Sequence, residues 1–308
     1  YGGSPVELPF ADKVAAILNM YLPGQHGGEA TRKLLFGEKN PCGKLAEMWV
    51  KSYSDVPYGE IFSKTQIEVY KESVFVGYRY YQKANNKVAF PFGFGLSYTT
   101  FGYSDMKIEE SGDELTVTAT VTNTGDRYGA EIAELYVKAP KTDVYKPEKE
   151  LRGFTKVYLE AGESKEVKIA INKSDLSYYN VKEKRYVLES GDYELQICSD
   201  CETVKLSETV TIEGENVSSP YDKEIFDIYE NSPDKVSDEA FEKMSGLKIP
   251  ALPPKRPITL ESRFTDLKET FMGKILYNAV LSVAKKDMKK ALKLPEGSER
   301  DNKIKGAM

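Results

Sequence analysis

The amino-acid sequence predicts an α+β multidomain fragment, in which the end of an α/β sandwich domain is followed by an antiparallel β-sandwich and then by a helical tail. Three observations support this prediction. The chain has 308 residues, more than the roughly 100 to 200 residues of one common domain. Its apolar residues change from mixed spacing to a period of two near residue 106. After residue 213 the pattern changes again, to proline-marked connectors and helical spacing.

The composition excludes several classes of protein. Hydrophobic residues make up 40% of the chain, and no apolar run approaches the roughly 18 to 20 residues of a membrane-spanning helix. A net charge of -5 does not indicate the strongly basic surface that is typical of nucleic-acid-binding proteins. Three cysteines argue against a disulfide-stapled secreted domain, so we expect a cytoplasmic rather than a secreted protein. Because the sequence begins at Tyr1 without a methionine, we expect the natural amino terminus, and any signal peptide on it, to lie outside this sequence.

Residues 1–60 are predicted to close the α/β sandwich domain. Apolar residues from Ala11 to Met20 have helical spacing. A second helical run begins at Gly27 and Gly28 and stops at Gly37, a typical helix C-cap residue. Residues 61–105 are predicted to form an inter-domain strap with the segments GYRYY (77–81) and FPFGFGLSYT (90–99). We call residues 90–99 the aromatic segment.

Residues 106–213 are predicted to form the β-sandwich. Apolar residues alternate along several short runs, and turn clusters such as Thr124-Gly125-Asp126 separate them. One strand every 8 to 12 residues over about 100 residues is typical of two packed antiparallel sheets. The residues expected on the apolar sides are Leu115, Val117, Ala119 and Val121; Ile132, Glu134 and Tyr136; Val167, Ile169 and Ile171; and Tyr193, Leu195 and Ile197.

Residues 214–308 are predicted to form an extended connector and an amphipathic helical tail. Pro250, Pro253, Pro254 and Pro257 mark the connector. Apolar residues near helical spacing predict one helix from Arg263 to Leu292. Residues 248–308 carry 14 Lys and Arg and seven Asp and Glu, so this part has a charge of +7 and the rest of the chain -12. We expect the apolar side to pack on protein rather than on a membrane, because the tail lacks a Trp anchor.

Three features could carry chemistry but are better explained otherwise. The glycine-rich stretch around His26 lacks the spacing of a nucleotide-binding loop, and His26 is expected to be a surface residue. Cys198 and Cys201 have the spacing of a redox or zinc half-site, but too few other ligands exist to complete one. We expect these two to be solvated thiols at a hairpin turn. With one histidine and three cysteines in the chain, we expect no metal.

Carboxylates and aromatic rings leave further alternatives open. Glu29, Asp55 and Glu60 lie in glycine- or proline-marked loops, where catalytic residues often occur, although solvated acids are far commoner there. The aromatic segment suits either a sugar-stacking platform or a buried connection between domains.

Four ordered motifs resemble the carboxyl-terminal half of a family 3 glycoside hydrolase of the β-glucosidase type. The first, PGQHGGEA (23–30) with LFGEKNPCGKL (35–45), is similar to the end of the family's α/β sandwich domain. The second and third are VGYRYY (76–81) and the aromatic segment. The fourth, VTNTG (121–125) with GAE (129–131) and LYV (135–137), is similar to the family's immunoglobulin-like domain, which is fibronectin type III-like. The family usually has Ser at Cys42 and Pro at Ala46, which are packing variants.

The resemblance implies a retaining hydrolase in which one carboxylate attacks the anomeric carbon and another protonates the leaving oxygen, with no metal or organic cofactor. In the family, the catalytic Asp lies on an upstream barrel domain and the acid/base Glu in an upstream loop, and neither motif occurs here. We therefore assign no catalytic residue to this chain, which is expected to be inactive alone. The substrate-binding residues and the oligomeric state stay unknown.

The resemblance also implies the substrate class of the parent enzyme, a small oligosaccharide or glycoside. β-Glucosides are the best single choice, while xylosides and arabinosides stay open. The alternative function is a non-catalytic β-sandwich module that binds carbohydrate or protein. Tyr178 and Tyr179 are the chief aromatic residues that the period-two pattern leaves for such a surface.

Overall fold

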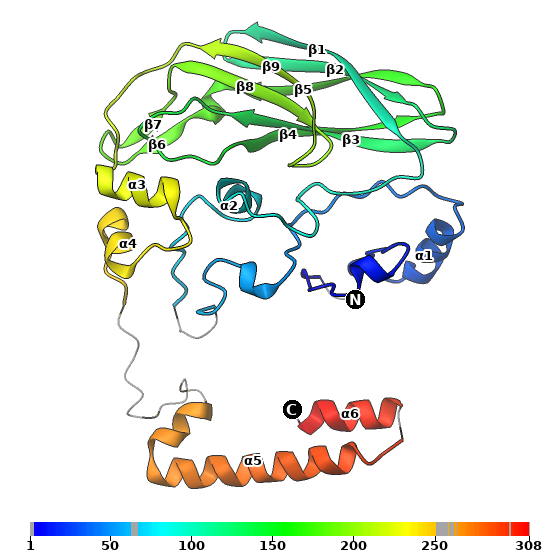
Figure 1. Cartoon of the computed structure of the whole chain (residues 1–308), viewed down its shortest axis with the longest axis vertical. Helices are drawn as coiled ribbons and strands as arrows, with labels where there is room; N and C mark the ends of the chain where they lie inside the picture. Colours follow the sequence, from blue (N-terminus) through cyan, green and yellow to red (C-terminus); the bar gives the residue numbers. More distant parts are fainter. Residues whose placement is uncertain are drawn as a thin grey trace. The chain divides into compact units, whose positions relative to one another are not determined.

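The computed structural model describes residues 3–62, 67–250, 258, 262, 264–295 and 297–307. The chain divides into two compact units, residues 1–249 and 250–308, whose elements are labelled in Figure 1. The helices and 3₁₀ turns of the first unit are η1 (Ala11–Lys13), α1 (Gly27–Leu35), η2 (Tyr53–Asp55), α2 (Tyr78–Lys83), η3 (Lys173–Leu176), α3 (Lys223–Asn231) and α4 (Asp238–Ser245). Its strands are β1 (Phe101–Ser111), β2 (Glu114–Asn123), β3 (Gly129–Lys138), β4 (Glu150–Leu159), β5 (Ser164–Asn172), β6 (Tyr178–Asn180), β7 (Arg185–Val187), β8 (Gly191–Cys198) and β9 (Val204–Ile212).

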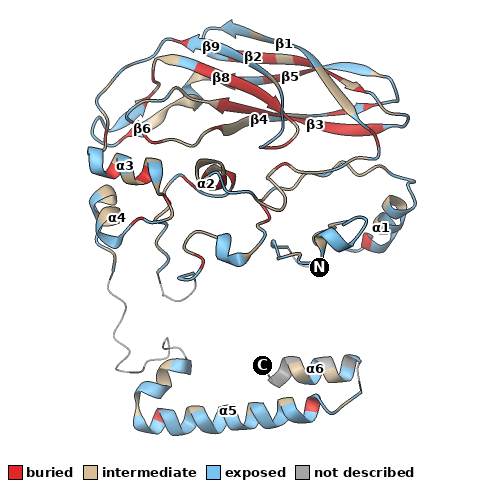
Figure 2. Ribbon diagram, viewed as in Figure 1, coloured by how far each residue is buried: buried red, intermediate tan, exposed pale blue. Residues whose placement is uncertain are grey.

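Two antiparallel sheets form the predicted β-sandwich. One has the strand order β1-β2-β5 and the other β4-β3-β8-β9, while β6 and β7 pair separately. Figure 2 shows the buried residues concentrated along the central strands. Because strands β3, β8 and β5 return to neighbours that are distant in sequence, the sandwich is held by long-range pairing rather than by hairpins alone.

Strand β2 follows the predicted alternation. Its apolar residues at 115, 117, 119 and 121 are fully buried in the sandwich core, whereas the threonines between them lie on the other side. Leu115 pairs with Ile171 and Val117 with Ile169 across the sheet, so the apolar sides of β2 and β5 form one surface. Burying one such side chain contributes about 1.5–3 kcal/mol, and this surface is the main reason for the fold of the three-stranded sheet.

Strand β3 is buried on both faces, which corrects the prediction for this strand. The expected apolar side included Tyr136, but Tyr136 points away from the sandwich core into a second cluster with Tyr78. The residues of β3 that face the sandwich core are Ala133, Leu135 and Val137. The period-two pattern selected the wrong face because a second layer, including α2, covers the outer side of this sheet (Figure 1).

The segment before residue 60 is less regular than predicted. The expected helix from Ala11 to Met20 is wrong, since only the 3₁₀ turn η1 forms there. Val14 and Ile17 stay 44% and 42% exposed, and a short helix without a partner for its apolar side is marginal in water. The second helix is confirmed as α1, and Gly37 behind it adopts a φ of +72°, a conformation that glycine adopts without strain.

Two short helices occupy part of the segment that was expected to be extended. Helix α4 begins at an N-cap, because the Ser237 hydroxyl accepts from the Ala240 N–H at 3.1 Å, and it ends at Gly246 with φ +70°. Tyr145 stacks on Tyr221 and on Tyr229 with ring centroids 4.3 and 4.7 Å apart. This stack holds α3 against the segment between β3 and β4.

The second unit consists of η4 (Phe264–Glu269), α5 (Phe271–Ala291) and α6 (Ser298–Ala307). The predicted single helix is divided at Thr270, whose hydroxyl accepts from the Gly273 N–H at 3.0 Å and so starts a new helix. Arg263, Pro253, Pro254 and Pro257 lie outside the described residues. Among the helices described, none is long and apolar enough to cross a membrane.

Candidate functional site

The aromatic segment lies between two parts of the first unit. On one side, the Leu45 N–H donates to the Phe94 carbonyl at 2.9 Å and the Trp49 N–H to the Phe90 carbonyl at 2.9 Å. On the other side, the Cys201 N–H donates to the Phe92 carbonyl at 2.9 Å. The segment therefore hydrogen-bonds both to residues 45–49 and to the turn between β8 and β9. Of the two roles left open by the sequence, these contacts favour a buried connection over a sugar-stacking platform.

Aromatic rings reinforce this connection. The Phe92 ring lies 5.2 Å from the Tyr78 ring of α2, which meets Tyr136 of β3 edge-on at 5.8 Å. The Tyr78 hydroxyl accepts from the Leu151 N–H of β4 at 2.9 Å. Figure 1 shows α2 beside the sheet that contains β3 and β4. Rings from three separate segments thus form one core beneath the sandwich.

The junction with the sandwich depends on Asn123, which belongs to the VTNTG motif. Its side chain is fully buried. Its Oδ1 accepts from the Thr99 hydroxyl at 2.6 Å, and its Nδ2 donates to the Arg127 and Leu159 carbonyls at 2.8 and 3.1 Å. A buried amide needs such partners, so this residue ties the end of the aromatic segment to β2 and β4.

Glu134 of β3 is a carboxyl group beneath the aromatic segment. It is 5% exposed, and its Oε2 accepts from the Tyr136 hydroxyl at 2.7 Å. Gly93 lies directly over it with φ +82°, and a Cβ at this position would stand 2.5 Å from Glu134 Oε2. Only glycine fits here, because both the backbone conformation and the space exclude a side chain.

Burial controls the ionisation of this group. Loss of solvation raises the pKa of Glu134 to about 7, while the Tyr136 hydroxyl and the nearby Lys44 act in the opposite direction. Burial, followed by the charge of Glu134, also raises the pKa of the Tyr136 hydroxyl. Lys44 itself pairs with Glu131 at 2.9 Å and donates to the Ser199 carbonyl at 2.9 Å. The cluster therefore links residue 44 to β3 and to the β8–β9 turn.

Cys198 and Cys201 are buried, so the expectation of solvated thiols is wrong. Both are fully buried and free, although they do lie at the β8–β9 turn. The turn is covered because the aromatic segment packs on it through Phe92. Burial raises the pKa of Cys198 to about 11 and that of Cys201 to about 12, and thiols of such high pKa are poor nucleophiles. Lys149 Nζ contacts Cys198 Sγ at 3.7 Å and Gln196 Oε1 at 2.9 Å.

The loop carboxylates considered for catalysis either contact residues close to them in sequence or are exposed. Glu29 pairs with Lys33 one helical turn away at 2.7 Å, and the Lys33 ammonium holds its pKa below the usual range. Asp55 accepts from the Ser52 N–H in a capping box. Glu60 and His26 are exposed, as expected for His26. Nothing in these contacts pairs two carboxylates for glycoside cleavage.

Glu134, at the centre of the cluster, is enclosed by the protein's own atoms. Within the described part of the chain, no three His, Cys, Asp or Glu residues gather to hold a metal ion. The Glu134 carboxyl accepts a hydrogen bond from the Tyr136 hydroxyl, and Gly93 covers it. Its chemistry is therefore structural: it can gain or lose a proton, but it does not face a substrate.

Sequence reasoning missed Glu134, Lys44 and Lys149 as members of this cluster. The usable signal was the nearly continuous apolar run of β3 from 132 to 137, which is typical of a strand covered on both faces. A charged residue within such a run has to be buried with partners. The hydrogen-bond partner of Glu134 is Tyr136, two residues away. Lys44, 90 residues earlier, joins the cluster through its ion pair with Glu131, and no local pattern reveals that contact.

Two family matches cover this architecture. Residues 1–98 match the glycosyl hydrolase family 3 C-terminal domain. Residues 131–201 match the fibronectin type III-like domain. The first match ends within the aromatic segment, and the second contains β8 and all but the first two residues of β3.

Curated relatives are similar over about two thirds of the chain. The thermostable beta-glucosidase B of Acetivibrio thermocellus is 43% identical over 215 residues, which cover 68% of this chain and 28% of that protein. The exo-alpha-(1->6)-L-arabinopyranosidase of Bifidobacterium breve is 39% identical, with 69% and 28% covered. The chain thus spans little more than a quarter of the length of these relatives.

Solved structures are similar as well. Beta-glucosidase 3B of Thermotoga neapolitana in complex with glucose has a TM-score of 0.65 and 39% identity, with 68% of this chain and 30% of that chain covered. The GH3 beta-glucosidase of Bifidobacterium adolescentis has a TM-score of 0.66 and 31% identity, with 89% and 36% covered. The second comparison extends further along the chain than the first.

Proposed function

We propose that this chain is a structural, non-catalytic part of a retaining β-glucosidase. The chain belongs to glycosyl hydrolase family 3 and carries the family's C-terminal and fibronectin type III-like domains. One observation carries the proposal. A single ten-residue segment hydrogen-bonds to residues 45–49 in the first matched domain and to the turn after β8 in the second. The sandwich is thereby joined to the α/β domain through a buried aromatic core.

The chemistry belongs to other parts of the whole enzyme. A retaining glycosidase needs two carboxyl groups about 5 to 5.5 Å apart on either side of the scissile bond. In this chain Glu29 is held by Lys33 and Asp55 by the Ser52 N–H, and Glu134 is sealed beneath Gly93. What the chain supplies is a rigid support for the domain that carries an active-site carboxylate.

The substrate of the whole enzyme is a terminal β-linked sugar, with β-glucosides first. The names of several relatives support this choice. The arabinopyranosidase of Bifidobacterium breve keeps arabinosides as a second possibility, and β-xylosides stay a third. The reaction needs no cofactor in this proposal. We place the protein in a reducing compartment, on the basis of its three free thiols.

The experiment is a rate measurement on the purified chain with nitrophenyl β-glucoside, with a complete family 3 β-glucosidase as the positive control. We expect hydrolysis at the rate of buffer alone. Turnover well above buffer that is lost in Glu29→Gln or Glu60→Gln would contradict the proposal, because it would place a catalytic carboxylate inside this chain.

A carbohydrate-binding module is the second candidate, and the β6–β7 pair favours it. Tyr179 and Tyr186 lie opposite each other across the strands, with rings 5.3 Å apart and side chains 48% and 71% exposed. Exposed rings stack on sugar faces. Affinity electrophoresis in gels containing soluble β-glucan tests this function: retardation that Tyr186→Ala abolishes would support it over a purely structural role.

A further inference from the structure

Cys42 and Lys156 bring a thiol and an amine together from two separate parts of the first unit. Lys156 Nζ lies 3.1 Å from Cys42 Sγ, although the two residues are 114 positions apart in the chain. Cys42 belongs to the match with the glycosyl hydrolase family 3 C-terminal domain, and Lys156 to the match with the fibronectin type III-like domain. Because Cys42 is only partly buried and Lys156 is exposed, small solutes can reach both reactive groups.

The chain on both sides of Cys42 is anchored to the sandwich. Two residues before it, Asn40 Nδ2 donates to the Tyr128 carbonyl at 3.1 Å. Two residues after it, Lys44 pairs with Glu131 of β3 at 2.9 Å. These anchors restrict how far the Cys42 thiol can move away from the sandwich.

Strand β4 holds Lys156 on the side that faces away from the sandwich core. The side chains at 154, 156 and 158 are exposed, and they alternate with the buried Val157 and Leu159. Lys156 Nζ also lies 5.5 Å from the centroid of the Tyr158 ring. Because a cation is attracted to the face of an aromatic ring, Tyr158 limits the movement of the long lysine side chain. Two restrained groups in contact react far faster than the same groups free in solution.

Oxidation allows a thiol beside an amine to form a covalent bond. A thiolate attacks a peroxide and becomes a sulfenic acid, which can condense with a nitrogen to form a sulfenamide. In the first step sulfur is oxidised and hydrogen peroxide is reduced, because one peroxide oxygen bonds to sulfur and the other leaves as hydroxide. In the second step the neutral amine attacks the sulfur. The S–N bond forms, the S–O bond breaks, and the oxygen leaves as water with one proton from the amine.

We propose that hydrogen peroxide converts the contact between Cys42 and Lys156 into a covalent bridge, through a bond between Cys42 Sγ and Lys156 Nζ. The bridge joins the two matched domains. It is reversible, because an added thiol attacks the bridged sulfur and releases the amine. Cys42 and Lys156 are thus a redox-sensitive modification site that fixes residues 40–44 to β4. This inference does not depend on the proposed function.

Oxidation of Cys42 also prepares the amine for the second step. The hydrogen bond to the Cys42 sulfur is the largest cause that raises the pKa of Lys156 above its ordinary value, whereas burial acts in the opposite direction. A sulfenic acid carries no charge, so the first step removes the negative charge of the thiolate while the burial stays. The pKa of Lys156 therefore falls, and the amine loses its proton more readily before it attacks the sulfur.

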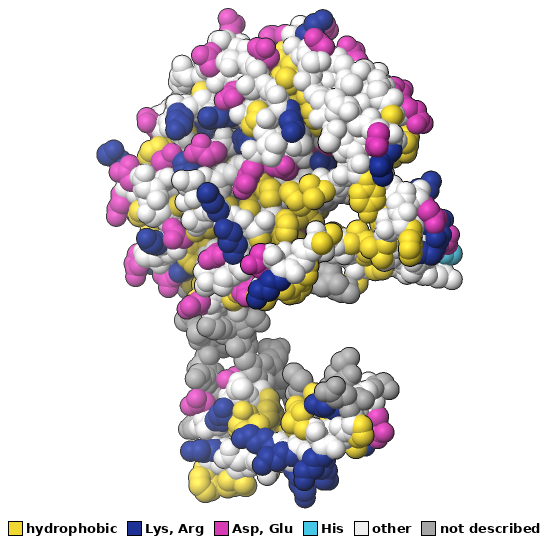
Figure 3. All heavy atoms as spheres, turned by 45° about the vertical axis from the view of Figure 1, so that its right-hand side comes forward, with side chains coloured by type: hydrophobic (Ala, Val, Ile, Leu, Met, Phe, Trp, Pro, Cys, Tyr) yellow, Lys and Arg dark blue, Asp and Glu magenta, His cyan; other side chains and the backbone are white. Residues whose placement is uncertain are grey.

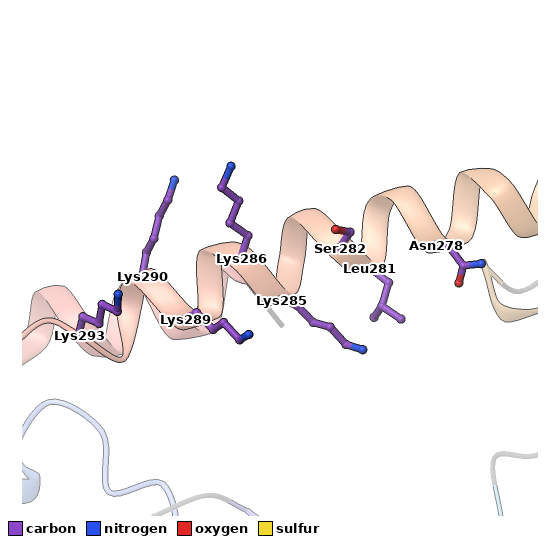
Figure 4. Close-up of a pocket in the computed structure, with 8 residues that line it drawn as sticks. All are labelled: Asn278, Leu281, Ser282, Lys285, Lys286, Lys289, Lys290 and Lys293. Carbon is purple, nitrogen blue, oxygen red and sulfur yellow. The ribbon is translucent and has the colours of Figure 1, made fainter.

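Other thiols and amines of the chain serve as internal comparisons. Cys198 has Lys149 at 3.7 Å, but both are buried, and burial raises the pKa of Cys198 to about 11, so little reactive thiolate forms there. Figure 3 shows Lys and Arg side chains spread over the surface. Figure 4 labels five exposed lysines of α5, which are Lys285, Lys286, Lys289, Lys290 and Lys293. A bridge that selects Lys156 over these amines therefore depends on the contact at 3.1 Å.

The test is peptide mass spectrometry of the whole chain after treatment with hydrogen peroxide at pH 8. Trypsin releases residues 40–44 and, because it does not cleave after a bridged lysine, residues 153–165. We expect these two peptides to be joined, with a mass two hydrogen atoms below their sum, and to separate after treatment with dithiothreitol.

Two variants show which amine forms the bridge. Lys156→Arg keeps the positive charge but removes the amine, so the yield of joined peptides should fall at least tenfold while Cys42 is still oxidised. Lys39→Arg is the matched control, because Lys39 is an exposed lysine only three residues from Cys42. This variant should give the same yield of joined peptides as the wild type.

Three results would overturn the proposal. The first is a wild-type chain in which Cys42 becomes a sulfenic or sulfinic acid and no peptides are joined. The second is a bridge from Cys42 to Lys39 or to the lysines of α5 as often as to Lys156, which would mean that the reaction does not depend on the contact. The third is a disulfide between the Cys42 residues of two molecules as the main product, seen as a dimer on a non-reducing gel.

Discussion

Replacing Glu134 by glutamine tests whether the junction beneath the aromatic segment depends on a protonated carboxyl group. The folded protein holds this proton more tightly than the unfolded chain, because burial raises the pKa from 4.5 to about 7. Between these two pH values the folded state therefore binds more protons than the unfolded state, and the free energy of unfolding falls as the pH rises. Above about pH 8 both states have lost the proton and the effect is constant.

The size of the effect follows from the same numbers. A pKa raised from 4.5 to about 7 corresponds to ~3 kcal/mol of stability that is present below pH 4.5 and lost by about pH 8. Glutamine has nearly the same shape and does not titrate, so E134Q avoids this loss. Relative to the wild type, the variant should gain about 2–3 kcal/mol in unfolding free energy between pH 5 and pH 8.

Urea unfolding at pH 5, 6, 7 and 8 measures this difference. Trp49 is the only tryptophan in the chain, is 4% exposed, and pairs with Phe90, so its fluorescence reports on the junction itself. Glu208→Gln, at an exposed position of β9, is the control and should differ from the wild type by the same small amount at every pH. The reasoning is refuted if the E134Q difference is equally constant from pH 5 to pH 8.

Other features of the first unit can be tested in the same way. Phe92→Ala should lower the unfolding free energy by about 2–4 kcal/mol, because it empties the contact with Tyr78, whereas Leu96→Ala at a 74% exposed position should change it by less than ~0.5 kcal/mol; equal losses would remove the special role of the ring. Iodoacetamide should label Cys42 first and spare Cys198 and Cys201 in the folded protein, as read by mass spectrometry, and early labelling of the pair would show that the turn opens. Hydrogen exchange should be slowest in β2, β3, β5 and β8 and complete within minutes before α1; slow exchange there would mean that this segment is stably folded without further chain.

The sandwich was predictable because one side of its strands faces solvent. On β2, threonines alternate with apolar residues, so the period of two identifies the buried side without further knowledge. On β3 both sides are covered, and the same rule chose the side of Tyr136 instead of that of Leu135. Where two layers compete for one strand, alternation alone cannot assign its faces.

The errors outside the sandwich have a common physical cause. Helical spacing from Ala11 to Met20 did not produce a helix, because no surface covers Val14 and Ile17. Conversely, α3 forms in a segment that looked extended, since the Tyr145 ring provides a stacking partner nearly 80 residues away. The burial of Cys201 depends in the same way on Phe92, whose carbonyl accepts from the Cys201 N–H. Each outcome was decided by a distant contact that the local sequence does not contain.

The double burial of β3 also limits how this protein can be divided. A fragment cut out at the edges of the two sheets would keep its inner packing but would leave Tyr136 and Glu134 facing water on its underside. A transplanted sandwich would need a substitute for the aromatic segment and α2. Without one, it would expose an apolar patch that promotes aggregation. Recombination that moves this region between proteins should therefore succeed when its crossover lies before residue 77 and fail when it lies at residue 100, even though the second point is where the first strand begins.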